Sequence, residues 1–160
     1  MDRDDALRVL LSKLLDWEDA HISFDSAVGG IPPESRCARP EGAPHSPWQL
    51  LEHVRICQRD ILDFCRNAEY VEMKFADYWP AGVAPPTDAA WDESIAAFRR
   101  DRDTLKTLVS DSGIDLFAPV SHGTGQTYLR ELVLVADHNA YHVGQLVLLQ
   151  RLLGVWRQPE

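Results

Sequence analysis

The sequence predicts an all-α fold, a four-helix bundle whose helices are joined by long connections. Four segments repeat their apolar residues at spacings of three and four, which is the period of helices that bury one face. Two of the connecting segments, 26–45 and 67–86, are rich in proline and longer than most links in compact domains. A chain of 160 residues is long enough for one domain with its own core, so residues 1–160 are expected to form a single domain.

The first helix is expected to run from Asp5 to about Asp25. His21 falls in the register of its apolar stripe, so the imidazole is expected to face the interior near the C-terminal end of this helix. Two roles are open for His21: a core histidine that hydrogen-bonds to a neighbour, or an additional polar group at a functional site. The apolar stripe comprises Leu7, Leu10, Leu14, Trp17 and Phe24.

The second helix has a sharply defined start. Ser46 is a natural N-cap, Pro47 suits the first helical position and Gln49 completes a capping box. The helix is expected to reach about Arg66. His53 adjoins its buried stripe and is expected to point partly into the bundle.

The third helix is expected to begin after an N-cap at Thr87 and to end at Ser112-Gly113. The aromatic-rich connection before it, 67–86, would either roof a pocket or plug the end of the bundle. The connection after it, 114–126, carries a weak hairpin signal, and His122 within it is expected at the surface. The buried stripe of the helix comprises Trp91, Ile95, Phe98, Leu105 and Val109.

The last helix is expected to begin after Thr127 and to be terminated by Gly154. His138 and His142 are four residues apart and therefore lie on one face of it, with Cβ atoms about 5–6 Å apart. Both imidazoles can then reach one cation. His53 of the second helix would supply a third imidazole, and three histidines with an open fourth position are typical of catalytic zinc sites.

The same helix is apolar on more than one face. A helix in a four-helix bundle is not fully enclosed, so the second apolar face needs another partner. We therefore expect a homodimer formed through the last helix. One side carries Leu132, Ala136, Ala140, Val143 and Val147, while Leu134 and Leu148 lie elsewhere.

Composition excludes several classes of function. The net charge of −9, with scattered Lys and Arg, argues against nucleic-acid binding. The last helix contains too many polar residues for a lipid span, and the acidic stretch Met1–Asp5 lacks the basic region of a secretion signal, so we expect no membrane association and a cytoplasmic location. The three cysteines form no CxxC pair, so Cys57 and Cys65 are expected to be small core hydrophobes.

Two stretches resemble the DinB-like (YfiT-type) metalloprotein superfamily. They are Ser46–His53, which reads SPWQLLEH, and His138–Gln145, which reads HNAYHVGQ and is followed by Arg151–Gly154. The resemblance spans most of the chain and implies a four-helix bundle, commonly dimeric, that binds zinc, nickel or another divalent metal ion. Some members are thiol-dependent transferases or isomerases that use low-molecular-weight thiols, and others are described as metal-dependent hydrolases. The family's three metal ligands match His53, His138 and His142.

Three neutral imidazoles leave a bound ion its full charge, so a water or thiol on that ion would be strongly acidified. The chain lacks the Glu-x-x-His elements of dinuclear bundles and the HExxH motif of metalloproteases. Three interpretations therefore remain: a hydrolase or thiol transferase acting on a small molecule, a metal-binding protein without catalysis, and a structural helical dimer. Weaker candidates for roles around the metal are His21, Asp137, Tyr141 and Gln145.

Overall fold

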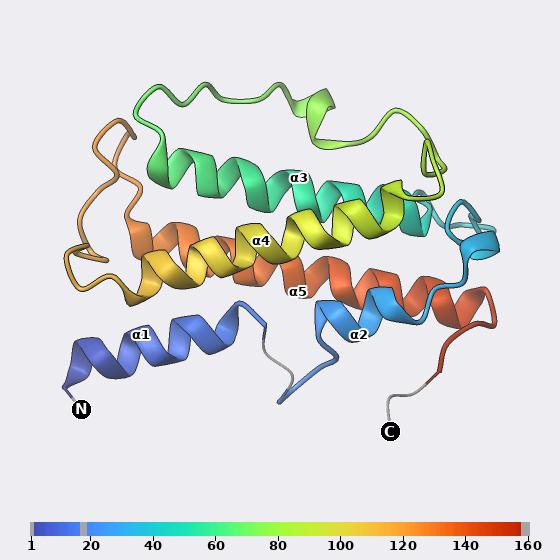
Figure 1. Ribbon diagram of the computed structural model, residues 1–160, viewed down its shortest axis with the longest axis horizontal. Helices are drawn as coiled ribbons and strands as arrows, with labels where there is room; N and C mark the ends of the chain where they lie inside the picture. Colours follow the sequence, from blue (N-terminus) through green and yellow to red (C-terminus); the bar gives the residue numbers. More distant parts are fainter. Residues whose placement is uncertain (1, 17–18, 158–160) are drawn as a thin grey trace.

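The computed structural model describes residues 2–16 and 19–157 (Figure 1). This part of the chain is all-helical, as the sequence predicts, and its only β feature is an isolated bridge between Pro119 and Thr127. It contains five α-helices rather than four. They are α1 (Arg3–Leu14), α2 (Phe24–Gly29), α3 (Pro47–Arg66), α4 (Ala90–Ser110) and α5 (Tyr128–Leu152), with short 3-10 helices η1 (Pro33–Ser35) and η2 (Phe75–Tyr78).

The long helices pack side by side, and their directions explain one of the long connections. α3 contacts both α4 and α5, α1 lies against α4 and α5, and α2 lies against α5. α3 and α4 run in the same direction, and α5 runs opposite to both (Figure 1). The chain between α3 and α4 must therefore travel back along α3, whose 20 residues span about 30 Å. Residues 67–89 make this return across the outer side of α3.

The prediction of one continuous first helix was wrong. α1 ends at Leu14 and α2 begins only after Ser23, whose Oγ accepts a hydrogen bond from the Ser26 backbone N–H at 3.2 Å. This new N-cap competes with continuation of the helix, because it gives the start of α2 a hydrogen bond of its own. His21 lies before the cap and is exposed rather than buried. Trp17 lies outside the described residues.

The predicted start of α3 and both predicted ends of α5 are confirmed. At α3, Ser46 Oγ accepts from the Gln49 backbone N–H at 3.2 Å, and Gln49 Oε1 accepts from the Ser46 backbone N–H at 3.1 Å. Thr127 caps α5 through its side chain, and Gly154 follows the helix with a φ of 71°. This left-handed conformation is one that glycine adopts without steric cost.

The predicted start of α4 was wrong by a few residues. Ala89, not Thr87, is the N-cap of α4, and its side chain makes no capping hydrogen bond. The backbone carbonyl of Thr87 instead accepts from the Ala90 N–H at 3.2 Å, which closes a turn ahead of the helix.

The core consists of two apolar clusters with polar side chains between them. Gln58 lies midway along α3, and its Nε2 donates to the Phe98 carbonyl at 2.8 Å. Asn139 of α5 donates to Gln58 Oε1 at 3.0 Å. His138 of the candidate site directly precedes Asn139, so the site lies near the junction of the two apolar clusters rather than inside either one. The first cluster includes Leu51, Val54, Trp91, Phe98, Val143 and Leu146, and the second includes Leu11, Leu62, Leu105, Val109, Leu132 and Val135.

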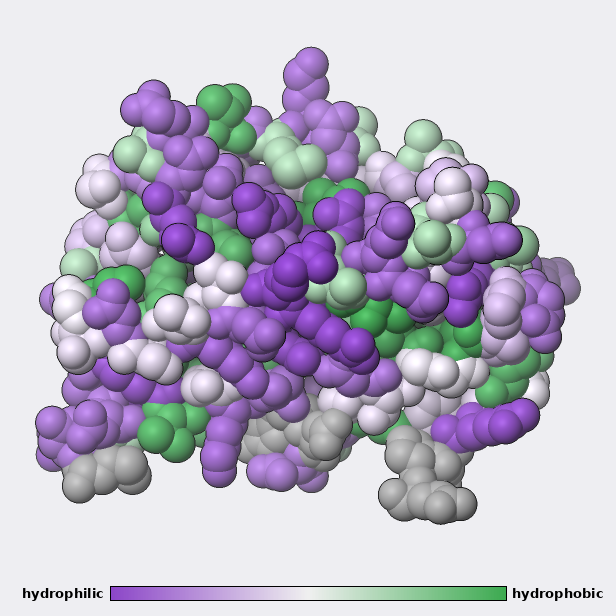
Figure 2. All heavy atoms as spheres, in the orientation of Figure 1, coloured by the Kyte–Doolittle hydropathy of each residue, from purple (hydrophilic) through white to green (hydrophobic). Residues whose placement is uncertain are grey.

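The outer surface over α4 is largely hydrophilic (Figure 2). The exposed residues of α4 include Arg99, Arg100 and Asp103, as the charged run in the sequence predicts. Within the described ranges, none of the helices has the length and hydropathy needed to cross a membrane.

Candidate metal centre

Packing of α3 against α5 brings together the three histidines that the sequence indicated. The Nε2 atoms of His53 and His138 lie 3.2 Å apart. The His142 ring centroid lies 4.6 Å from that of His53 and 4.5 Å from that of His138. Two nitrogen ligands of one tetrahedral zinc lie about 3.3 Å apart, given Zn–N bonds of about 2.0–2.1 Å. The separation between the first two imidazoles therefore suits a shared ion.

Hydrogen bonds orient two of these rings. His53 Nδ1 lies 2.8 Å from the backbone carbonyl oxygen of Tyr78, and His142 Nδ1 lies 2.8 Å from Gln145 Oε1. Both oxygens are acceptors, so each Nδ1 carries the proton and each Nε2 is left with a free lone pair. Such partners fix the tautomer that a metal ligand needs.

The environment keeps these imidazoles uncharged. Burial lowers the pKa of His138 to about 4, with further lowering by the neighbouring His142 and His53. Burial is also the main cause of the lowered pKa values of His53 and His142, and it outweighs the opposing effects of the hydrogen bonds that these rings donate to Tyr78 and Gln145. Neutral imidazoles are the form that binds metal ions.

Cys57 is part of this cluster, which sequence reasoning missed. Ligand-type atoms of His53, Cys57 and His138 all lie within 4.8 Å of one another. Burial, and then the charge of Asp60, raise the pKa of the Cys57 thiol to about 12, so without a metal ion it stays protonated. The sequence analysis predicted that Cys57 is a small core residue, which explains its burial but not its position beside His53 and His138. The signal was present in the sequence: Cys57 follows His53 by four residues and so shares its helix face.

An aromatic layer covers His53. The ring of Trp79 stacks on it with centroids 3.8 Å apart and an interplanar angle of 2°, and His45 stacks on Trp79 with centroids 3.7 Å apart. The connection 67–86 therefore covers the candidate site through Trp79, which favours a roof over the site, the first of the two roles left open for this connection. His45, from the connection before α3, was not identified from the sequence.

The loop that carries Trp79 is held to α3 by Asp60. Its Oδ2 accepts a hydrogen bond from Tyr78 Oη at 2.8 Å, and its Oδ1 accepts one from Tyr70 Oη at 3.1 Å. Burial, then the charge of Asp60, raise the pKa of Tyr70 to about 12. Asp60 thereby fixes Tyr78, whose carbonyl orients His53.

The weaker sequence candidates take different positions. Gln145 contacts the cluster through His142, as described above. Tyr141 is 64% exposed, with its ring edge-on to His142 at 4.8 Å, and Asp137 is exposed on α5. His21 is exposed, and its Nδ1 lies 2.9 Å from a backbone carbonyl oxygen, outside the cluster. His122 is half-buried rather than on the surface.

The donor set fits a divalent metal ion. Two of its imidazoles present a free Nε2 lone pair. In the described part of the chain, His138 Nδ1 and the neighbouring Asn139 Oδ1 are buried without a hydrogen-bond partner. The ion would contact His138 through Nε2, the ring nitrogen that lies 3.2 Å from His53 Nε2, so the fit rests on the neutral imidazole donors and not on these two atoms.

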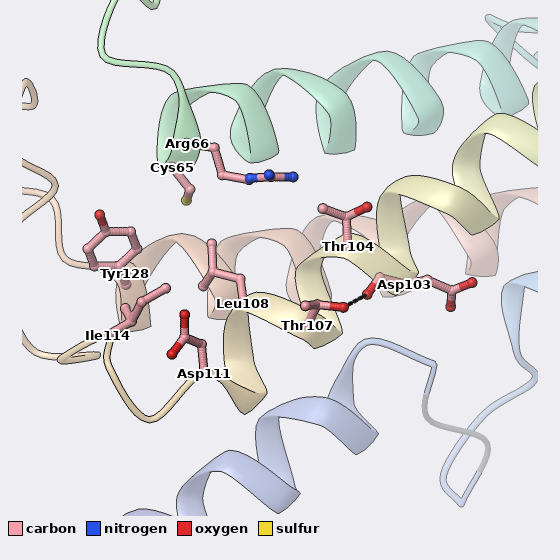
Figure 3. A pocket seen from close by; sticks show the side chains of 9 residues that line it. All are labelled: Cys65, Arg66, Asp103, Thr104, Thr107, Leu108, Asp111, Ile114 and Tyr128. Atoms are coloured by element: carbon pink, nitrogen blue, oxygen red, sulfur yellow. Dashed lines mark hydrogen bonds between the residues drawn. The ribbon is translucent and has the colours of Figure 1, made fainter.

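A separate cavity of about 600 Å³ lies at the other end of α3 (Figure 3). Cys65 and Arg66 line it from α3, and Asp103 and Thr107 line it from α4. Burial, then the charge of Glu131, raise the pKa of the Cys65 thiol to about 12, so this cysteine is a poor nucleophile. No histidine occurs among the described residues that line the cavity.

Residues 17–146 match the family described as the DinB superfamily. No curated protein and no solved structure shows significant similarity to the chain.

Proposed function

The chain belongs to the DinB superfamily, and from this premise we propose that it is an enzyme that uses one divalent metal ion to activate water or a thiol. His53, His138 and His142 would hold the ion. The observation that carries the proposal is the 3.2 Å separation of the His53 and His138 Nε2 atoms, with His142 against both rings. Neutral imidazoles suit zinc or nickel.

When bound, such an ion lowers the pKa of a water or thiol at a free coordination position. The protein's own residues orient and cover the imidazole rings. Tyr78 and Gln145 hold the rings of His53 and His142 in the binding tautomer. Trp79 covers one ring and limits access of solvent. Because a bound ion would supply this acidity, the three-histidine cluster would need no additional general base for hydrolysis or thiol transfer.

A second candidate function is metal binding without catalysis, which the presence of Cys57 in the cluster suggests. Three histidines plus a thiolate would close a tetrahedral site, as in structural zinc sites, whereas catalytic sites keep one position open. The distances support the open site. A sulfur bound to the same ion as His53 Nε2 would lie about 3.6 Å from that atom and farther from Nδ1. Cys57 Sγ is instead closer to Nδ1, at 3.6 Å, than to Nε2, at 3.8 Å. Cys57 would have to rotate to bind.

Metal analysis of protein purified without an affinity tag tests the proposed site. We expect one equivalent of metal in the wild-type protein and a loss of binding in His138→Ala. His21→Ala is the matched control, because His21 is exposed outside the cluster and its loss should leave the metal content unchanged. Substoichiometric metal that is unaffected by His138→Ala would refute metal binding.

The spectrum of the cobalt(II) form separates the open from the closed site. An open site gives no thiolate-to-cobalt charge-transfer absorption, and Cys57→Ser should leave the spectrum unchanged. Such an absorption that disappears in Cys57→Ser would establish the closed site. Ester hydrolysis and thiol-transfer assays of the metal-loaded protein then test catalysis. Activity that survives His53→Ala would contradict the proposal.

We also propose the homodimer through α5. In support, Val133 and Tyr141 are exposed along this helix at a spacing of eight residues, which places them on one face. Tyr141→Asp should convert a dimer to a monomer in light scattering. Val71→Asp is the control, because Val71 is exposed on the connection after α3. A monomeric wild-type protein at micromolar concentration would refute the dimer.

A further inference from the structure

An apolar pocket of about 280 Å³ lies beside the histidine cluster. It is enclosed by residues 41–45, by Leu50 in the first turn of α3 and by the last turns of α5. His53 and His142 lie on the same two helices, within one turn of Leu50 and Gln145 respectively. The pocket is lined by Glu41, Gly42, Ala43, Pro44, His45, Leu50, Gln145, Leu148, Leu149 and Leu152.

The pocket and the cluster share two side chains. Gln145 lines the pocket, and its Oε1 lies 2.8 Å from His142 Nδ1. His45 also lines the pocket, and its ring stacks on Trp79, which stacks on His53. The polar end of the pocket is therefore the end that faces the candidate metal ligands.

Apart from His45, Gln145 and the exposed Glu41, the pocket is lined by apolar residues and suits an apolar group. Its inner wall contains Leu50 and Leu149, which are almost fully buried. Its rim contains Leu148 and Leu152, which are 56% and 57% exposed. Leucine side chains this exposed are stabilised when an apolar ligand removes them from water.

We propose that this pocket holds a short alkyl or aryl group of the substrate, while the reacting group of the same molecule lies at the metal centre. The proposal rests on the proposed function, because it places the reacting group there. The volume lies near the lower end of the range of about 300–1,000 Å³ for ligand pockets, so it suits a short chain or a single ring rather than a long lipid. The substrate class is therefore a small amphiphile.

Binding of alkyl hydroxamates to the zinc-loaded protein tests this, because the hydroxamate group chelates metal ions and the chain can be lengthened in steps. From acetohydroxamate towards octanohydroxamate, each buried methylene should tighten binding about fourfold until the pocket is full. Leu152→Ala should weaken binding of the long hydroxamates only. Val71→Ala is the control: it also truncates an exposed aliphatic side chain, but it lies outside both the pocket and the proposed dimer face.

Ala43→Phe should fill the pocket and remove the dependence on chain length. Retention of acetohydroxamate binding by this variant would show that it is folded and metal-loaded. The same chain-length dependence in Ala43→Phe and wild type would overturn the proposal. So would a Leu152→Ala variant that changes the oligomeric state but not the binding of long chains, because the rim would then be a subunit contact.

Octanol binding to the metal-free protein can be measured by displacement of a fluorescent apolar dye. This assay separates failure of the pocket from failure of the metal site. A protein without a metal site would bind no hydroxamate of any length. Octanol binding that is lost in Ala43→Phe would then still support the pocket. An absence of octanol binding to the wild-type protein would overturn it.

Discussion

The hydroxyl of Tyr78 is predicted to control metal affinity although it touches no ligand. Tyr78 uses two groups: its hydroxyl donates to Asp60 at 2.8 Å, and its backbone carbonyl accepts from His53 Nδ1 at 2.8 Å. Tyr78→Phe removes the hydrogen bond to Asp60. The carbonyl that accepts from His53 Nδ1 is then no longer held in place by that bond. The imidazole of His53 should then sample orientations that do not bind metal.

The size of the effect follows from this one hydrogen bond. A hydrogen bond to a charged acceptor stabilises by about 1.5–3 kcal/mol, and the partial exposure of Tyr78 places this one at the lower end. Loss of a direct partner of a metal-bound histidine costs about 10–100-fold in metal affinity. The Tyr78 hydroxyl does not bond to His53 itself but holds the residue whose carbonyl does. We therefore expect metal affinity to fall about tenfold, which corresponds to about 1.4 kcal/mol.

Tyr70→Phe is the matched control. Tyr70 also donates to Asp60, at 3.1 Å, but no group of Tyr70 bonds to the cluster. Zinc affinity, measured by competition with a chromophoric chelator, should fall about tenfold in Tyr78→Phe and stay near wild type in Tyr70→Phe. Equal losses in the two variants would refute the reasoning, because they would show that the whole loop, not the Tyr78 carbonyl, supports His53.

Three further predictions concern stability. Burial raises the pKa of Asp25, but hydrogen bonds from Arg102 and Arg99 outweigh this effect and lower the pKa below the ordinary 3.8. The carboxylate therefore stabilises the fold above that pH. Asp25→Asn should cost about 1 kcal/mol in urea unfolding at pH 7, and the difference should shrink as pH falls below 3.8; a constant difference would contradict this. Thr127→Ala removes the hydrogen bond that caps α5 and should cost about 1 kcal/mol in thermal unfolding, whereas an unchanged midpoint would refute this role. Chelation of a metal held at 100 times its Kd should lower the unfolding free energy by about 2.7 kcal/mol, and His138→Ala should show no such change.

The elements that were predicted well are those whose signals are local. The capping box at Ser46 and the glycine after α5 each act within a few residues, so the ends of these helices could be placed from the sequence. The spacing of His138 and His142 is also local, since the helix alone puts both on one face. His53 needed only the assumption that two amphipathic helices pack through their apolar stripes.

The first helix failed because two local signals conflict there. The apolar spacing continues through His21 to Phe24, which favours one helix, while Ser23 offers an N-cap that starts another. Periodicity alone does not decide between them, because a capped start and a continued helix place similar residues inside. The structure follows the cap, and His21 is left exposed between the two helices.

The roof of the site could not be predicted, because it depends on helix direction. No local signal shows that α4 runs parallel to α3, yet this arrangement forces residues 67–89 back along α3 (Figure 1). The return path brings Trp79 over the ring of His53. Only then can Trp79 stack on that ring and the Tyr78 carbonyl orient it. The candidate metal centre thus has two kinds of parts: histidines placed by the helix period, and a covering loop placed by the topology. Substitutions in the loop should alter affinity and access while leaving the ligand set intact.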